Sequence, residues 1–210
     1  MCSQTLKPSV RAVIFDLGRV LVNMDSGPLK EKLFQNFKAD DIEKPERQFL
    51  KNPIMVSLNC GRLSPVDFHR QVCDACRLDM NLQTFKALWC DIFWTMDGME
   101  ELVGEVCKKV PVGLLSDTDP VHWEYIRTRW PWIGSIANPT LSYEVGVMKP
   151  SPAIYLAAAG HVQTPPEQCL FIDDLQANVD GARAVGMQGI RFESVEHLKQ
   201  EIKKYLNGSA

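Results

Sequence analysis

The chain alternates between short, uninterrupted apolar runs and longer segments in which apolar residues recur every three or four positions. A short apolar run bounded by turn residues is typical of a buried strand, and the longer period is typical of an amphipathic helix. These patterns predict strands at residues 11–17, 110–116, 169–173 and 188–192. They predict helices at residues 99–109, 120–130, 151–160, 177–186 and 195–206.

The segment that follows the first strand has a different pattern. From Ser26 to about Met96 the periodicity is helical, with breaks at Asn52–Pro53 and in "NCGRLSP", and no stretch resembles a strand convincingly. Strand and helix then alternate to the end, which is the order of an α/β, Rossmann-like doubly wound parallel sheet. We therefore predict a core formed by residues 1–23 and 98–210, with an inserted α-helical cap at residues 24–97.

Composition limits the classes of partner. The 210 residues are 45% hydrophobic and 23% charged, which suits one compact domain with a small inserted subdomain. A net charge of −3 provides no basic field for nucleic acid or an anionic membrane, so we expect neither partner. No apolar run is long enough for a signal peptide or a membrane span. We expect a cytoplasmic monomer or homodimer.

The seven cysteines are an odd number spread along the chain, which favours reduced thiols over a disulfide framework. Cys73 and Cys76 form a CxxC, and His69 lies on the same face if this stretch is helical. These residues suit either a metal or redox site or ordinary core packing. Because no second CxxC follows and a structural zinc needs four ligands, core packing is the favoured interpretation.

Polar residues follow the predicted strands. Asp16 ends the first strand, Ser116 and Asp117 end the second, and Asp173 and Asp174 end a later one. In open α/β sheets, ligands bind beyond the carboxyl ends of the strands, so these side chains are expected to gather at one edge.

Carboxylates gathered at one edge repel one another unless a cation lies between them. An oxygen-rich site of this kind suits Mg²⁺, which prefers a few carboxylates, waters and a substrate phosphate. Lys149 in "GVMKPSP" and the Ser116 hydroxyl could hold the anion. With the charge neutralised, the Asp16 carboxylate could act as a nucleophile on phosphorus.

Four stretches, "FDLGRVL", "LLSDT", "GVMKPSP" and "FIDDLQANVDGARAVG", resemble in order and spacing the four motifs of haloacid dehalogenase-like hydrolases. The resemblance spans nearly the whole chain and is strongest to phosphatases with a helical cap after the first motif. It implies a Mg²⁺-dependent phosphatase that hydrolyses a small phosphorylated metabolite through an aspartyl-phosphate intermediate. A sugar phosphate is one candidate substrate.

The resemblance also implies residue roles. Asp16 would be the nucleophile, and Ser116 and Lys149 would contact the phosphate, Lys149 also being catalytic. Mg²⁺ would be held by Asp16, the main-chain carbonyl of Gly18 and the acidic pair of Asp173 and Asp174. Asn178 would orient that pair.

Gly18 departs from the family pattern. Most of these phosphatases carry there a second aspartate, which protonates the leaving group and later activates water. Its loss predicts a slow enzyme, since general acid–base help is worth about 10²–10⁴-fold. A good leaving group such as a sugar 1-phosphate, or another residue, could compensate, and a subgroup of related phosphatases also reads Asp-x-Gly. The alternative is a catalytically weak or inactive member that binds a phosphorylated ligand or a protein partner.

Three further residues have two interpretations each. Asp117 is a candidate for substrate contact and for the substitute acid, or it caps the helix near Pro120. Arg19 and Arg62 are candidates for substrate binding, or they are ordinary surface charges. The aromatic residues Phe85, Trp89, Phe93 and Trp94 are expected to pack the core of the cap and its seat on the main domain.

Overall fold

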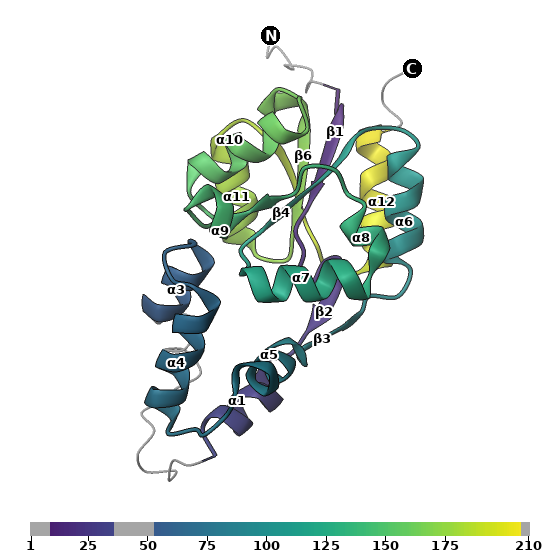
Figure 1. Cartoon of the computed structure of the whole chain (residues 1–210). Helices are drawn as coiled ribbons and strands as arrows, with labels where there is room; N and C mark the ends of the chain where they lie inside the picture. The colour runs from purple at the N-terminus through teal and green to yellow at the C-terminus, as the bar shows by residue number, and fades with distance from the viewer. Residues whose placement is uncertain (1–8, 36–52, 207–210) are drawn as a thin grey trace.

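The computed structural model describes residues 9–35 and 53–206 (Figure 1). Its centre is a sheet of five parallel strands in the order β5-β4-β1-β6-β7. The strands are β1 (Ala12–Phe15), β4 (Val112–Ser116), β5 (Thr140–Leu141), β6 (Cys169–Asp173) and β7 (Gln188–Arg191). This is the predicted α/β, Rossmann-like fold.

Helices cover both faces of the sheet (Figure 1). On one face, Val13 and Phe15 of β1 pack in a core with α6 (Met99–Cys107) and α12 (Val195–Leu206). On the other face, residues 12 and 14 pack with α10 (Pro152–His161) and α11 (Gln176–Ala184). Because successive side chains of a strand point to opposite faces, an uninterrupted apolar run is what a strand covered on both sides requires.

The longer predicted elements are confirmed, among them α7 (Pro120–Arg129). The short elements were not predicted, among them β5, α8 (Pro131–Gly134), α9 (Ser142–Val145) and the 3₁₀ turn η2 (Pro166–Gln168). Each is too short to complete a hydrophobic period, so its pattern cannot be separated from that of a loop.

The segment between β2 (Val22–Met24) and β3 (Phe93–Thr95) is mainly helical in the described residues. It contains α1 (Gly27–Leu33), α3 (Pro53–Asn59), α4 (Pro65–Cys76) and α5 (Leu82–Cys90), drawn below the sheet in Figure 1. These helices share a core of their own, which includes Leu33, Leu58, Phe68 and Trp89.

The expectation of a purely helical segment up to about Met96 was wrong. Strand β3 pairs antiparallel with β2, with Trp94 opposite Asn23. The two strands therefore join the beginning and the end of the helical segment. Helix α5 ends at Cys90 with Asp91 as its C-cap, so the apolar residues that follow serve a strand. Trp94 is 50% exposed in this ribbon, which corrects its expected place in the cap core.

The other three aromatic residues lie as expected. Phe85 and Trp89 are buried, and Phe93 packs against both this core and that of the main sheet. Within the described residues, no helix combines the length and apolarity that a membrane crossing needs.

Candidate active site

Three polar side chains emerge at the carboxyl edge of the sheet. Asp16 follows β1 directly, and Ser116 and Asp173 are the last residues of β4 and β6. The Asp16 amide donates to the Ile172 carbonyl at 2.8 Å, so the carboxyl ends of β1 and β6 lie side by side. All three side chains are buried, with exposed fractions of 7%, 3% and 0%. The structure therefore places these three strand-end residues at one edge of the sheet, as the sequence predicted.

Lys149 lies at the centre of this group. Its Nζ is 2.7 Å from Asp16 Oδ1 and 2.7 Å from Asp173 Oδ2. Burial alone would lower the pKa of Lys149, but the carboxylates of Asp16 and Asp173 more than reverse this and raise it. Burial raises the pKa of Asp16 to about 7, although the Lys149 ammonium opposes the rise. One buried cation thus holds two carboxylates that come from neighbouring strands.

The oxygens of Asp16, Asp173 and Asp174 lie within 4.8 Å of one another, and we call these three residues the acidic cluster. Among the described residues they are the group of acids, histidines or cysteines that could hold a metal ion. Burial, with the Asp173 charge beside it, raises the pKa of Asp174. A hard divalent cation relieves this repulsion, and an all-oxygen donor set suits Mg²⁺.

Asp173 is held rigidly. The Asn178 side chain donates to both Asp173 oxygens at 3.0 Å, and the Leu175 amide donates to Oδ1 at 2.8 Å. The resemblance implied that Asn178 orients the acidic pair, and its contacts with Asp173 place it where it can do so.

Asp117 lies at the end of β4 and contacts the loop that carries Lys149. Its Oδ1 accepts the main-chain N–H of Lys149 at 2.9 Å. The suggestion that Asp117 caps the next helix is wrong, because Asp119 does so, accepting the amides of Val121 and His122. Burial raises the pKa of Asp117. The contact ties the end of β4 to the loop that carries Lys149.

Arg19 stands at the mouth of the acidic cluster. Its backbone is left-handed, at φ 61°, and its amide donates to the Val22 carbonyl at 2.6 Å. The guanidinium, 60% exposed, lies 4.0 Å from Asp174 Oδ2. It is thus close enough to meet a ligand that reaches the cluster.

Arg62 lies in the turn between α3 and α4. The preceding residue, Gly61, has φ +67°, and a Cβ added there would lie 2.1 Å from the Tyr143 carbonyl oxygen. Tyr143 belongs to α9 of the main domain, so this turn of the helical segment touches the core directly.

A second polar group joins the helical segment to the core, and it was not predicted. Asp119 Oδ2 accepts the Trp89 indole N–H at 3.1 Å and lies 2.9 Å from His122 Nδ1. His122 Nε2 lies 2.9 Å from the Trp89 carbonyl, and the two rings stack at 5.1 Å. We call Trp89, Asp119 and His122 the cap joint, after the cap that the sequence predicts for this helical segment. The Asp-Pro pair at residues 119–120, a good helix start, was the available signal.

Both nitrogens of the His122 ring face groups that only accept, a carboxylate and a carbonyl. The ring must therefore donate from both nitrogens, which is the charged form. Burial alone would lower the pKa of His122, but Asp119 reverses this and raises it. Burial would raise the pKa of Asp119, and His122 lowers it overall.

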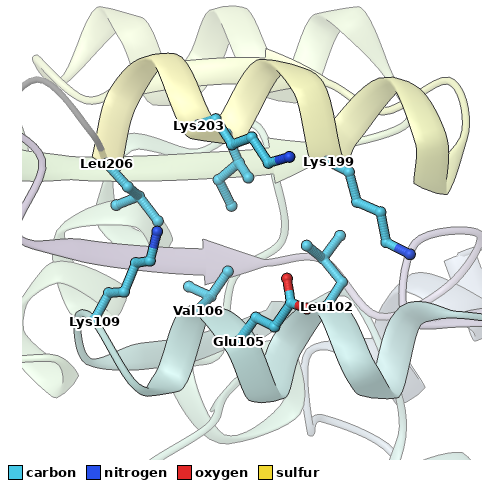
Figure 2. A pocket seen from close by; sticks show the side chains of 8 residues that line it. Leu102, Glu105, Val106, Lys109, Lys199, Lys203 and Leu206 are labelled. Carbon is cyan, nitrogen blue, oxygen red and sulfur yellow. The ribbon is translucent and has the colours of Figure 1, made fainter.

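Two other features do not form a site. His69 Nε2 and Cys73 Sγ both turn to the Met80 carbonyl, at 2.7 and 3.9 Å, which supports the core interpretation of the CxxC. A groove of about 230 Å³ lies between α6 and α12, with an apolar floor and lysines at its rim (Figure 2). None of the predicted site residues lines it.

Comparisons with known proteins agree with this geometry. The chain is 25% identical to a D-ribitol-5-phosphate phosphatase of Bacteroides thetaiotaomicron, over 94% of this chain and 99% of that protein. A crystal structure of a HAD family enzyme from the same organism superposes with a TM-score of 0.81 at 22% identity, covering 93% of this chain and 99% of the other.

A second structure of that enzyme, in complex with magnesium and inorganic phosphate, gives a TM-score of 0.76 at 24% identity, covering 89% and 96% of the two chains. Likeness at this level establishes the shared fold. Residues 10–186 match the family of haloacid dehalogenase-like hydrolases. With its parallel sheet and its acids at the carboxyl edge, the chain belongs to the haloacid dehalogenase-like hydrolase family.

Proposed function

We propose that this hydrolase is a Mg²⁺-dependent phosphatase, which transfers the phosphoryl group of a small phosphorylated metabolite to Asp16 and then to water. The observation that carries the proposal is the contact of Lys149 with both Asp16 and Asp173 inside the buried acidic cluster. A carboxylate nucleophile, a fixed cation and further carboxylates for a metal are the parts that phosphoryl transfer requires.

Each residue has a role that follows from its place. Asp16 attacks phosphorus, and the Lys149 ammonium and the Ser116 hydroxyl hold the phosphoryl oxygens. Mg²⁺ would be held by Asp173, Asp174, Asp16 and the Gly18 carbonyl. When bound, the ion neutralises the carboxylates and the phosphate, so that two anions can approach each other.

Residues 24–97 form the cap in this proposal, and residues 1–23 and 98–210 form the catalytic core. The turn that carries Arg62 touches α9, which supports Arg62 as a contact for the part of the substrate beyond the phosphate. Arg19 is proposed as a second contact. The D-ribitol-5-phosphate phosphatase relative supports a phosphorylated sugar or polyol as substrate.

The direct test compares the wild type with Asp16→Asn on a panel of phosphorylated metabolites with added Mg²⁺. We expect Mg²⁺-dependent release of phosphate by the wild type and none above background by the variant. Equal rates for the two proteins would contradict the proposed nucleophile.

Gly18 supports a second candidate function, because it lacks the acid–base side chain that most related phosphatases carry there. In that case the protein binds a phosphorylated ligand without hydrolysing it. The same panel separates the two, using thermal unfolding as a second readout. A ligand that stabilises the fold while no substrate is turned over would favour the binding protein.

A further inference from the structure

The helical segment between β2 and β3 meets the main domain through two pairs of helices. Helix α5 lies against α7, and α3 lies against α9. The first contact contains the cap joint, and the second contains the close approach of Gly61 to the Tyr143 carbonyl. Because Arg62 follows Gly61, its place relative to the main domain depends on how both contacts hold the segment.

On the side of the main domain, the cap joint continues the loop that follows β4. Asp119 lies three residues after Ser116 in this loop and is fully buried. Between them, the Thr118 amide donates to Ser142 Oγ at 3.0 Å, and this hydroxyl donates to the Thr118 carbonyl at 3.1 Å. Ser142 begins α9, the helix that carries Tyr143. The proposed phosphate contact Ser116, the start of α9 and Asp119 are therefore fixed to one another.

On the side of the helical segment, ring contacts connect the cap joint to the turn that carries Arg62. The Trp89 ring lies edge-on to Phe68 of α4, with the ring centroids 4.9 Å apart. The Phe68 amide donates to the Ser64 carbonyl at 2.8 Å in the first turn of α4. Ser64 is the N-cap of this helix and follows Arg62 by two residues. Both rings are buried in a close-packed core, so a displacement of Trp89 is expected to move the start of α4.

The contacts of the cap joint require a proton on both nitrogens of the His122 ring. Nδ1 lies 2.9 Å from Asp119 Oδ2, and Nε2 lies 2.9 Å from the Trp89 carbonyl. A neutral imidazole can donate to only one of these acceptors, and its other nitrogen then faces an acceptor with a lone pair. The Phe93 ring, which lies edge-on to His122, carries no charge. We therefore expect loss of this proton to loosen α5 from α7.

The groups around the cap joint favour His122 as the one that titrates between pH 6 and pH 9. Asp119 is the charged group that acts on His122. Burial raises the pKa of Cys90, a neighbour of Asp119, to about 12. Burial also raises the pKa of Tyr143, which is another titratable group near Asp119. Both the thiol and the phenol therefore stay neutral in this range.

We propose that the cap joint positions the turn of Arg62 relative to the loop of Ser116, and that it holds this position while His122 is charged. His122 is a positioning residue in this scheme, because it acts on the substrate through Arg62. A displacement of about 1 Å far from the reacting atoms can cost an enzyme about 10²-fold in rate. The inference rests on the phosphatase function proposed above and adds a pH-dependent control of substrate binding.

The first test follows the turn by NMR and needs no turnover. The methyl groups of Leu63, the residue after Arg62, are compared with the His122 ring from pH 6 to pH 10. We expect the Leu63 shifts to follow the His122 titration in the wild type. In His122→Gln at pH 7, they should already resemble those of the wild type at pH 10 and should not titrate. The methyl groups of Val106 in α6 should stay unchanged in both proteins.

The second test measures binding with Mg²⁺ present. In His122→Gln we expect KM for D-ribitol 5-phosphate to rise by about tenfold, and kcat to change less because the acidic cluster is untouched. The affinity for inorganic phosphate should stay close to that of the wild type, since this ion has no further part for Arg62 to contact. In the wild type, KM should rise with pH at the His122 midpoint, and the variant should lack this rise. If D-ribitol 5-phosphate is not hydrolysed, its dissociation constant replaces KM.

Three further variants separate positioning from stability. Trp89→Phe keeps the pair of Asp119 and His122 but removes the indole donor, so it should raise KM by a smaller factor. His197→Gln removes another histidine that faces an acid, 3.9 Å from Glu201 Oε1 on α12, and should leave KM unchanged. Ile202→Val removes one buried methyl group from the core of the main domain and should lower stability without raising KM.

Each result decides between the two proposals. The inference is wrong, and the phosphatase function stands, if the Leu63 shifts at pH 7 are the same in the wild type and His122→Gln, or if KM rises equally in Ile202→Val. If the wild type hydrolyses no phosphorylated metabolite, the phosphatase function is overturned, and the NMR comparison alone decides whether the cap joint positions the turn.

Discussion

Lys149 Nζ lies 2.7 Å from Asp16 Oδ1, a buried ion pair that joins the loop before α10 to the end of β1. The same ammonium lies 2.7 Å from Asp173 Oδ2 on the neighbouring strand β6. Lysine therefore supplies the positive charge on which the packing of these acids depends. A Mg²⁺ ion at the acidic cluster would share that task.

Lys149→Met should destabilise the fold by about 3–5 kcal/mol in the absence of Mg²⁺, because two buried carboxylates lose their counter-charge. Added Mg²⁺ should raise the melting temperature of this variant more than that of the wild type, since the ion then replaces the lost charge. Thermal unfolding with and without Mg²⁺ measures both effects.

Lys204→Met is the matched control, because Lys204 pairs with Glu201 on the exposed face of α12. We expect no measurable change there, with or without Mg²⁺. If Mg²⁺ stabilised Lys149→Met and the wild type equally, the ion would not be compensating for the lysine.

The Asp117 contact predicts a difference between two substitutions. Asp117→Asn keeps an oxygen that can accept the Lys149 N–H, and we expect nearly wild-type stability and Mg²⁺-dependent activity. Asp117→Ala leaves that amide without its acceptor and should cost about 1–3 kcal/mol. It should also weaken binding of inorganic phosphate, because the Lys149 loop loses its tie. Urea unfolding and phosphate titration measure the two effects, and equal behaviour of the two variants would exclude the positioning role.

The sequence predicted the sheet and the residues at its edge because both depend on local patterns. Buried runs ending in Asp16, Ser116 and Asp173 are readable as strands, and parallel strands bring their carboxyl ends to one edge. The contact of Lys149 with Asp16 is harder to predict from local patterns, because the loop that carries Lys149 is positioned by contacts with distant parts of the chain.

The features that the sequence did not predict depend on contacts between residues that are apart in the chain. Trp94 lies in an apolar run that suits a helix or a strand equally, and only pairing with β2 decides between them. The cap joint depends on Trp89 meeting His122, 33 residues later in the chain, and no local pattern encodes such a contact. Likewise, the thioether beside Gly18 comes from Met24, on the far side of a tight turn.

The cap joint predicts a pH dependence. The pKa of His122 is raised above its ordinary value of 6.5, so its contribution to stability is complete below pH 6.5 and is lost as the pH rises through the folded-state value. Asp119 acts in the opposite direction: its pKa is lowered, so its contribution is present above pH 3.8 and is lost as the pH falls through the folded-state value.

Urea unfolding between pH 6 and pH 9 should therefore show a loss of stability in the wild type that His122→Gln lacks. Besides Asp119, the groups that face His122 are the Trp89 ring and carbonyl and the edge of Phe93. NMR titration of the His122 ring in the wild type gives its pKa directly. A value at or below 6.5 would contradict the charged joint.

The indole N–H of Trp89 has its own test. Trp89→Phe keeps an aromatic ring against His122 but removes the donor to Asp119, and should cost about 1–3 kcal/mol. Trp94→Phe is the control, because that ring is 50% exposed on β3 and should change little. Equal effects of the two substitutions on urea unfolding would show that the indole bond to Asp119 contributes nothing.

The turn that carries Arg62 provides the last prediction. Gly61→Ala places a methyl group 2.1 Å from the Tyr143 carbonyl at a left-handed residue, so the turn must move off the core. If Arg62 contacts substrate from this turn, Gly61→Ala and Arg62→Ala should both raise KM, by about tenfold, and change kcat less, since the acidic cluster is untouched. Gly104→Ala in α6 is the matched control, because an added methyl group there meets nothing within 4 Å. If KM is unchanged in both variants and in the control, Arg62 and its turn do not contact the substrate.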